Sequence, residues 1–227
     1  MAKFELDGIT LRIPNKCLTP PLEQALNSGR YENGETAALK RHMTFGDRLL
    51  DLGAGAGYVS SVAARVLGGE NVISVEASPD MIEVLSRNLK ANDAKDATVL
   101  HGAVVADGYE GDTVEFAMRK AFWASSIAGD SEPKGIVHAV PALRLSTLLA
   151  SHRPSIVVMD IEGAEVALCQ QPWPDCVRLL VMEIHTNRYP PSAVKAIFDG
   201  LSQTGMTYMP WGSRGEVLVF QRVYPDA

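Results

Sequence analysis

Short apolar runs alternate along this chain with segments whose apolar residues recur at helical spacing. Nearly continuous runs of this kind are typical of strands buried on both faces. They predict parallel strands over residues 48–51, 72–75, 98–101, 156–160 and 179–184. Helical spacing predicts one helix over 58–67 and another over 79–92, the second with Ser78 as its N-cap and Pro79 at its first position. This alternation of strands and helices predicts an α/β domain.

The two ends of the chain follow a different pattern. Residues 1–45 hold a predicted hairpin and two helices, and we expect them to form an N-terminal cap on the main domain, 46–227. Near the C-terminus, segments 206–209 and 216–222 predict a second hairpin, which adds an antiparallel strand to the parallel sheet.

An insertion over 107–141 interrupts the alternation with clusters of Asp, Gly and Ser and holds one weakly patterned strand, predicted over 136–140. Long insertions between sheet strands are often functional. Its aromatic pair, Phe122 and Trp123, is expected either to line a substrate pocket or to anchor a small core, and the pattern does not decide between them.

Composition narrows the class of protein. The chain has 227 residues, 46% hydrophobic and 21% charged, with a net charge of -6 and no basic run, so binding to a nucleic-acid backbone is not expected. The three cysteines form no CxxC pair, which argues against a disulfide framework or a zinc cluster. With no long apolar segment to suggest a signal peptide or a membrane span, we expect a cytoplasmic protein.

The most informative motif is a glycine turn between a strand and a helix, the arrangement of a nucleotide-binding domain. It runs over residues 51–57 and includes Asp51, Gly53, Ala54 and Gly55. A carboxylate here repels a pyrophosphate but attracts a cation, such as the ammonium group of S-adenosylmethionine (SAM). The third glycine is Gly57, one position short of the dinucleotide spacing, so SAM is favoured over NAD. We assign Asp51, Gly53, Ala54 and Gly55 to its methionine part.

Further residues at strand ends complete the predicted cofactor site. Glu76 ends the second strand, where a carboxylate accepts hydrogen bonds from ribose hydroxyls. Tyr31 and Glu35 of the cap are expected to close the methionine end. The adenosine and adenine are expected to border residues just after the second and third strands, namely Ala77, Ser78, Gly102, Ala103 and Val104.

The segment Asp-Ile-Glu-Gly-Ala-Glu at 160–165 resembles the hallmark motif of the FkbM-type SAM-dependent methyltransferases. Segments 30–35, 124–127, 140–148 and 181–185 resemble other parts of that family, in the same order. The resemblance implies a Rossmann-like class I methyltransferase fold, with a mostly parallel seven-stranded sheet and an antiparallel C-terminal strand. It also implies O-methylation of a small molecule, of the sugar or natural-product type.

Asp160, Glu183 and His185 follow the fourth and fifth strands and are the candidate catalytic residues. An imidazole with an ordinary pKa of ~6.5 is neutral at working pH, so His185 is the preferred general base for a hydroxyl acceptor. The alternatives are a structural histidine, and for Asp160 the N-cap of a helix starting near Gly163. Glu162 and Glu165 lie at that helix start, where a structural role is favoured for Glu165 and Glu162 is undecided. The catalytic three could also assemble a metal site, but their spacing does not demand one and none is assigned.

Two other functions stay open. One is an NAD-dependent oxidoreductase, against which Asp51 and the glycine spacing argue. The other is a non-catalytic module with the SAM fold that binds a partner protein. The sequence does not determine the acceptor or the oligomeric state.

Overall fold

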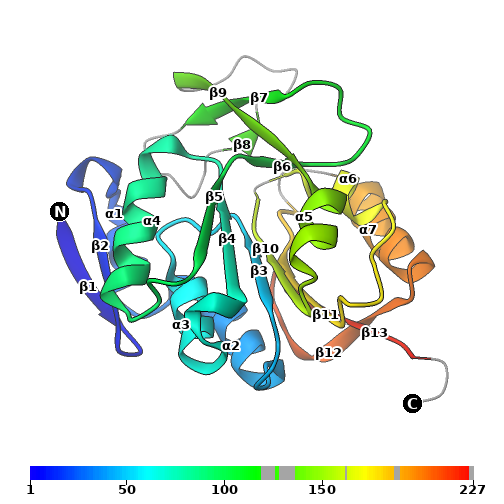
Figure 1. Ribbon diagram of the computed structural model, residues 1–227, viewed down its shortest axis with the longest axis horizontal. Helices are drawn as coiled ribbons and strands as arrows, with labels where there is room; N and C mark the ends of the chain where they lie inside the picture. Colours follow the sequence, from blue (N-terminus) through cyan, green and yellow to red (C-terminus); the bar gives the residue numbers. More distant parts are fainter. Residues whose placement is uncertain (119–125, 128–135, 162, 187–189, 225–227) are drawn as a thin grey trace.

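A seven-stranded sheet forms the centre of the protein (Figure 1). The computed structural model describes residues 1–118, 126–127, 136–161, 163–186 and 190–224. The sheet order is β12-β13-β11-β10-β3-β4-β5. Its five parallel strands that were expected from apolar runs are β3 (Leu49–Leu52), β4 (Val72–Glu76), β5 (Thr98–His101), β10 (Ile156–Met159) and β11 (Leu179–Glu183). Each lies within one residue of its predicted bounds at either end.

Side chains along the central strands point alternately to the two faces of the sheet, and each face packs against its own part of the hydrophobic core. Leu49 packs on one face with Ala38 of α2 and Val59 of α3. Leu50 and its neighbours on the other face pack against α5, α6 and α7. Both faces are therefore apolar, which is why the strands read as nearly uninterrupted hydrophobic runs.

All four helices that the sequence predicted from local signals are present. They are α1 (Pro20–Asn27), which packs on the N-terminal hairpin, and α2 (Asn33–His42), α3 (Tyr58–Leu67) and α4 (Pro79–Ala91), which pack on the central sheet. Ser78 is the N-cap of α4 and Pro79 its first residue, as expected, although the Ser78 side chain makes no capping hydrogen bond. The remaining helices are α5 (Leu145–His152), α6 (Glu165–Cys169) and α7 (Pro191–Gln203), with short 3-10 turns at Asn15–Cys17 and Gly69–Asn71.

The predicted C-terminal hairpin is confirmed. β13 (Val217–Arg222) inserts between β11 and β12 (Met206–Arg214) and is antiparallel to both. The register of β12 shifts between Met209 and Arg214, so the hairpin is irregular at its turn. The result is a mostly parallel sheet with an antiparallel C-terminal strand.

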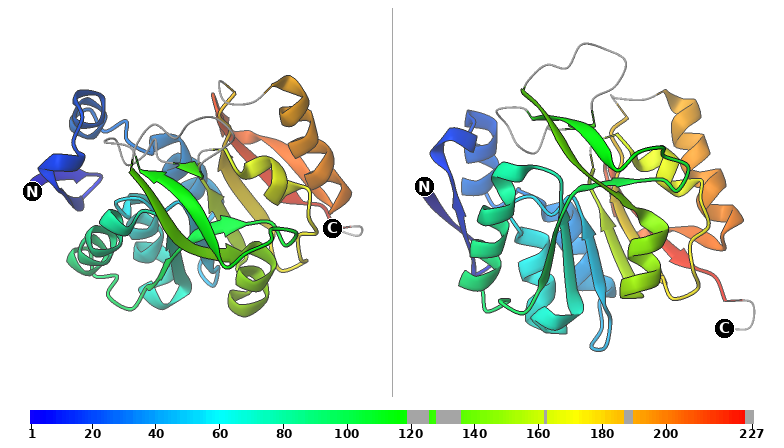
Figure 2. Two further views of the ribbon diagram at one scale, coloured as in Figure 1. Left: turned by 90° about the horizontal axis from the view of Figure 1, so that it is seen from above. Right: turned by 45° about the horizontal axis from the view of Figure 1, so that its top comes forward.

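A second, four-stranded sheet crosses one end of the large one (Figure 2). Its order is β6-β9-β7-β8, with β6 (Ala103–Val105), β7 (Thr113–Met118), β8 (Ser126–Ile127) and β9 (Ile136–Arg144). The strand expected over 136–140 is thus longer, and β7 was not foreseen. Phe122, Trp123 and the 124–125 part of the family-like segment lie outside the described residues.

The N-terminal hairpin of β1 (Ala2–Leu6) and β2 (Ile9–Ile13) packs beside α4 (Figure 1). The amides of Thr10 and Arg12 donate to the side chains of Asn92 and Asn88, at 2.8 and 2.9 Å. Asn88 also donates to the carbonyl of Ala56 in the glycine turn, which links the hairpin to that turn. Within the described ranges, no helix has the length and hydropathy that a membrane span requires.

Candidate functional site

The glycine turn leaves β3 and is held in place by backbone geometry. The amides of Gly53 and Ala54 donate to the carbonyl of Val75, at 2.9 and 3.0 Å. Gly53 has φ +89°, and a Cβ there would lie 1.9 Å from the carbonyl oxygen of Asp160. Only glycine allows the first turn residue to pack directly against the end of β10.

Glu76, at the end of β4, supports the same turn. Its Oε2 accepts the amide of Gly55 at 2.7 Å and its Oε1 accepts the amide of Ser78 at 2.6 Å. One carboxylate therefore joins the glycine turn to the start of α4. The sequence predicted that Glu76 binds the ribose hydroxyls, but it did not predict that Glu76 also supports the backbone of the turn. Burial raises the pKa of Glu76 against the opposing effect of these bonds.

Asp51 is buried between β3 and α3. Its Oδ2 accepts the hydroxyl of Ser60 at 2.5 Å, and Ser60 lies 2.7 Å from the hydroxyl of Ser74. Burial raises the pKa of Asp51 to about 7, and the charges of Glu76 and Asp160 add to that rise. The carboxylate is therefore costly to hold in its ionised form unless a positive group lies nearby.

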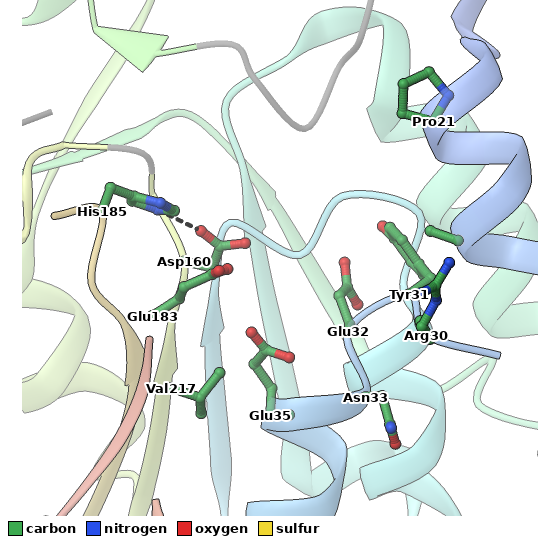
Figure 3. Close-up of a pocket in the computed structure, with 12 residues that line it drawn as sticks. Pro21, Arg30, Tyr31, Glu32, Asn33, Glu35, Asp160, Glu183, His185 and Val217 are labelled. Atoms are coloured by element: carbon green, nitrogen blue, oxygen red, sulfur yellow. Dashed lines mark hydrogen bonds and ion pairs between the residues drawn. The ribbon is translucent and has the colours of Figure 1, made fainter. Parts of the chain in front are cut away.

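Three predicted catalytic side chains meet at the adjoining ends of β10 and β11 (Figure 3). Oδ1 of Asp160 lies 3.1 Å from Nε2 of His185. One ligating atom from each of Asp160, Glu183 and His185 lies within 4.8 Å of the others, so this group could hold a metal ion. β10 pairs with both β3 and β11 in register, which places these ends next to the glycine turn.

The contacts of Asp160 and Glu165 bear on the structural roles considered for these two acids. Asp160 is not the N-cap of the following helix, because α6 begins at Glu165 with Ala164 as its N-cap, and Asp160 contacts His185 instead. Glu165 accepts the amide of Gly163 at 3.1 Å, in keeping with a structural role at the helix start. It also approaches His185, with Oε1 3.7 Å from Nε2. Glu162 lies outside the described residues.

A cavity of about 430 Å³ opens in front of these strand ends (Figure 3). Its far wall comes from the link between α1 and α2, with Tyr31 and Glu32, and from the first turn of α2, with Glu35. A smaller cavity of about 10 Å³ lies beside the glycine turn, lined by Glu32, Glu35, Asp160 and the turn residues Asp51, Gly53 and Ala54. Residues that precede β3 therefore reach the predicted site. Sequence reasoning assigned no role to Glu32, although it lies in the family-like segment 30–35.

The cavity carries far more acid than base among its described lining residues. Glu32, Glu35, Asp160 and Glu183 face one arginine, Arg30. Burial raises the pKa of Glu35 to about 8, and the charges of Glu183 and Asp160 add to the rise. Burial also raises the pKa of Glu183 and, more strongly, that of Glu32. A bound cation would relieve this repulsion, so the site is suited to a positively charged ligand.

These features fit SAM, whose sulfonium and ammonium groups are both positive. Tyr31 is buried and lines the cavity, and its hydroxyl interacts with the carboxylate of Glu32. A polar or positive ligand group would find both side chains on this wall. The residues that would hold SAM are those around the glycine turn, with Glu76, Tyr31 and Glu35 beside it.

The predicted adenine residues lie apart from the two cavities. The amide of Gly102 donates to the carbonyl of Glu76 at 3.0 Å, so this segment does follow the end of β4. Ala103 and Val104 belong to β6 and pack in two different hydrophobic clusters. Ala77 packs partly buried against one of them. None of these residues lines either cavity, and their contact with adenine stays a prediction.

Comparison with known proteins gives the family. The Methyltransferase FkbM domain matches residues 51–203, which is more than half of the chain. Protein-L-isoaspartate O-methyltransferase 1 of Archaeoglobus fulgidus is 38% identical over 58 residues, 25% of this chain and 27% of that protein. Ribosomal protein L11 methyltransferase of Bacillus subtilis is 35% identical over 75 residues, 33% and 24% of the respective chains. The chain spans about a quarter of the length of these relatives.

Among solved structures, M. jannaschii TYW2 in complex with AdoMet has a TM-score of 0.50 at 11% identity, covering 97% of this chain and 86% of that one. This likeness shows the class I methyltransferase fold. The family match disfavours the NAD-dependent and non-catalytic alternatives. The chain belongs to the FkbM methyltransferase domain family.

Proposed function

We propose that this protein methylates a hydroxyl oxygen of a small molecule, with SAM as the methyl donor. SAM supplies a methyl group that its sulfonium charge already activates. The protein must align the acceptor oxygen with that methyl group and favour loss of the hydroxyl proton. The cavity of about 430 Å³ would hold both partners, because the smaller one beside the glycine turn is only about 10 Å³.

We assign the glycine turn, and the side of the larger cavity next to it, to the methionine part of SAM. Asp51 is a buried carboxylate at the start of the turn, Gly53 and Ala54 line the cavity beside it, and Gly55 follows them in the turn. Tyr31 and Glu35 close this end from the cap. Glu76 would accept the ribose hydroxyls with lone pairs left after its two backbone bonds.

The adenosine is assigned to the residues that follow β4 and β5. Ser78 and Ala77 come directly after Glu76, and Gly102 is hydrogen-bonded to its carbonyl. Backbone groups of Gly102, Ala103 and Val104 would border the adenine. This placement follows the general rule that ligands bind beyond the carboxyl ends of parallel strands.

The acceptor is assigned to the side of the larger cavity formed by Asp160, Glu183 and His185. These groups would orient the hydroxyl by hydrogen bonds and favour release of its proton. Nε2 of His185 faces Asp160 and Glu165, at 3.1 and 3.7 Å, so these two acids fix the ring orientation. The assignment of His185 as the general base stays a prediction.

The observation that carries this proposal is the convergence of acids from three strand ends and the cap on one cavity beside a glycine turn. The first test is calorimetric titration of the protein with S-adenosylhomocysteine and, separately, with NAD. We expect only the former to bind. Preferential binding of NAD would contradict the cofactor assignment.

The second test incubates the protein with SAM carrying a ¹³C-labelled methyl group and a panel of sugars, phenols, hydroxy acids and amines. NMR then locates the label in the product. We expect transfer to oxygen of a hydroxyl compound. Transfer only to nitrogen or carbon would contradict O-methylation while leaving the SAM assignment intact.

A further inference from the structure

The ends of β10 and β11 bring together two carboxylates and an imidazole of different chain segments. Asp160, Glu183 and His185 each present a ligating atom within 4.8 Å of the other two. Oδ1 of Asp160 and Nε2 of His185 are 3.1 Å apart. Adjacent ligands of an octahedral ion with bonds of about 2.1 Å lie about 3 Å apart. This pair therefore already has the separation that one ion requires.

Glu165 provides a second, independent observation. Its side chain is fully buried, and its Oε1 lies 3.7 Å from Nε2 of His185. Its Oε2 has no hydrogen-bond partner among the described residues. A buried carboxylate near Asp160, with one oxygen unsatisfied, is unfavourable without a positive charge close by. A cation bound on this side of the cavity would supply that charge.

The acids at the ends of β10 and β11 lie on the wall of the larger cavity. Glu183 and Glu35 line that wall, with Arg30 as the one arginine or lysine among its described lining residues. We place the positive groups of SAM beside the glycine turn, next to Asp51. A cation bound at the strand ends would balance acids that SAM does not contact in this assignment.

We propose that Asp160, Glu183 and His185 bind a divalent cation of the Mg²⁺ or Mn²⁺ class, with Glu165 as a buried acid that supports His185. Two carboxylate oxygens and one imidazole nitrogen form a mostly oxygen ligand set, which such ions accept. Asp160 and Glu183 are partly exposed to the 430 Å³ cavity, so the remaining ligand positions face open space. Water or acceptor oxygens would fill them.

This site rests on the proposed function for its role in the reaction. A cation held on the acceptor side would bind the acceptor through an oxygen and lower the pKa of its hydroxyl, and the ring nitrogen of His185 that binds the cation would then act as a ligand and not as the general base. It would also favour acceptors that offer two neighbouring oxygens. The binding site itself does not depend on methyl transfer and can be tested without SAM or acceptor.

The test is a titration of the full chain with Mn²⁺ alone, following the free-ion signal by electron paramagnetic resonance. We expect one Mn²⁺ per chain with a Kd below about 1 mM, and displacement by excess Mg²⁺. Glu183→Gln and Asp160→Asn are each expected to weaken binding at least about tenfold. Glu216→Gln is the matched control, because Glu216 lies at the start of the neighbouring strand, exposed and bonded to Thr186. It should change the Kd less than about twofold.

Absence of saturable Mn²⁺ binding to the wild-type protein would overturn the proposal, and this result needs no variant to fold. Equal weakening by Glu216→Gln and Glu183→Gln would also overturn it, since it would indicate attraction to general negative charge. Circular dichroism confirms that each variant is folded. If the protein binds no Mn²⁺ and methyl transfer persists in EDTA, the cation site is contradicted and the proposed O-methyltransferase function is not. Specific Mn²⁺ binding without transfer to any acceptor would support the site and count against the proposed function.

Discussion

Replacing Asp51 with asparagine is expected to stabilise the ligand-free protein while weakening its cofactor site. Asp51 is 2% exposed and contacts the hydroxyl of Ser60. Burial raises its pKa from 3.8 to about 7. Asn has nearly the same shape and can still accept the Ser60 bond through its amide oxygen, but it carries no charge to bury.

The size of the effect follows from the pKa of Asp51. Each pKa unit corresponds to about 1.4 kcal/mol, so a rise from 3.8 to about 7 corresponds to about 4 kcal/mol. The amide of Asn brings a new donor into a buried place, which costs about 1–2 kcal/mol if it finds no acceptor. We therefore expect Asp51→Asn to raise the free energy of unfolding by about 2–3 kcal/mol at pH 8.

The sign of the pH dependence provides a sharper test. Because the folded state holds the Asp51 proton more tightly than the unfolded state, this group's contribution to stability is fully present below pH 3.8 and is lost as the pH rises toward 7. The gain from Asp51→Asn should thus be large at pH 8 and small near pH 4.5. Urea unfolding followed by circular dichroism, without SAM, measures it at both values.

Asp47, just before the same strand, is the matched control with the opposite sign. Burial would raise its pKa, but the bonds from Arg178, Ser155 and the Thr44 amide outweigh it and lower the pKa to about 2. Its contribution to stability is present above pH 3.8 and is lost as the pH falls toward 2. Asp47→Asn should therefore lower the free energy of unfolding at pH 8, by about 2 kcal/mol. An Asp51→Asn variant less stable than wild type at pH 8, or equally stabilised at pH 8 and 4.5, would refute the reasoning about buried charge.

Three further predictions concern ligand binding and turnover. Asp51→Asn should weaken S-adenosylhomocysteine binding at least about tenfold, because a hydrogen bond to a charged group is lost, which corresponds to about 1.5 kcal/mol or more. Wild-type affinity in calorimetry would place the methionine end of the ligand elsewhere. Glu76→Ala should weaken the same binding by about 1.5–3 kcal/mol. It should also lower the free energy of unfolding, because the amides of Gly55 and Ser78 lose their acceptor, and unchanged urea unfolding would contradict this supporting role of Glu76. His185→Gln should reduce turnover in steady-state kinetics about 100-fold or more, while calorimetry should show S-adenosylhomocysteine affinity changed less than about threefold. Equal losses of turnover and affinity would indicate that His185 has a structural role.

Local pattern was enough to predict the order of elements. Strands buried on both faces need nearly continuous apolar residues, so β3, β4, β10 and β11 were visible in the sequence. The half-exposed edge strand β5 was recognised from its place in the alternation of strands and helices. Pro79 and the glycine turn also have local conformational meaning, and α3 and α4 were predicted almost to the residue. The acids at the strand ends followed from the general place of sites in open α/β sheets.

Tertiary structure alone decided how those residues meet. The contact of Asp160 with His185 joins positions 25 apart in the chain and depends on the parallel register of β10 and β11. The bonds from Glu76 to the backbone, and the approach of Glu32 from the cap, depend on side-chain direction and long-range packing. The second sheet was missed for the same reason, since its strands pair across an insertion without a strong local pattern. Periodicity fixes the face a residue occupies, but only packing brings distant residues together.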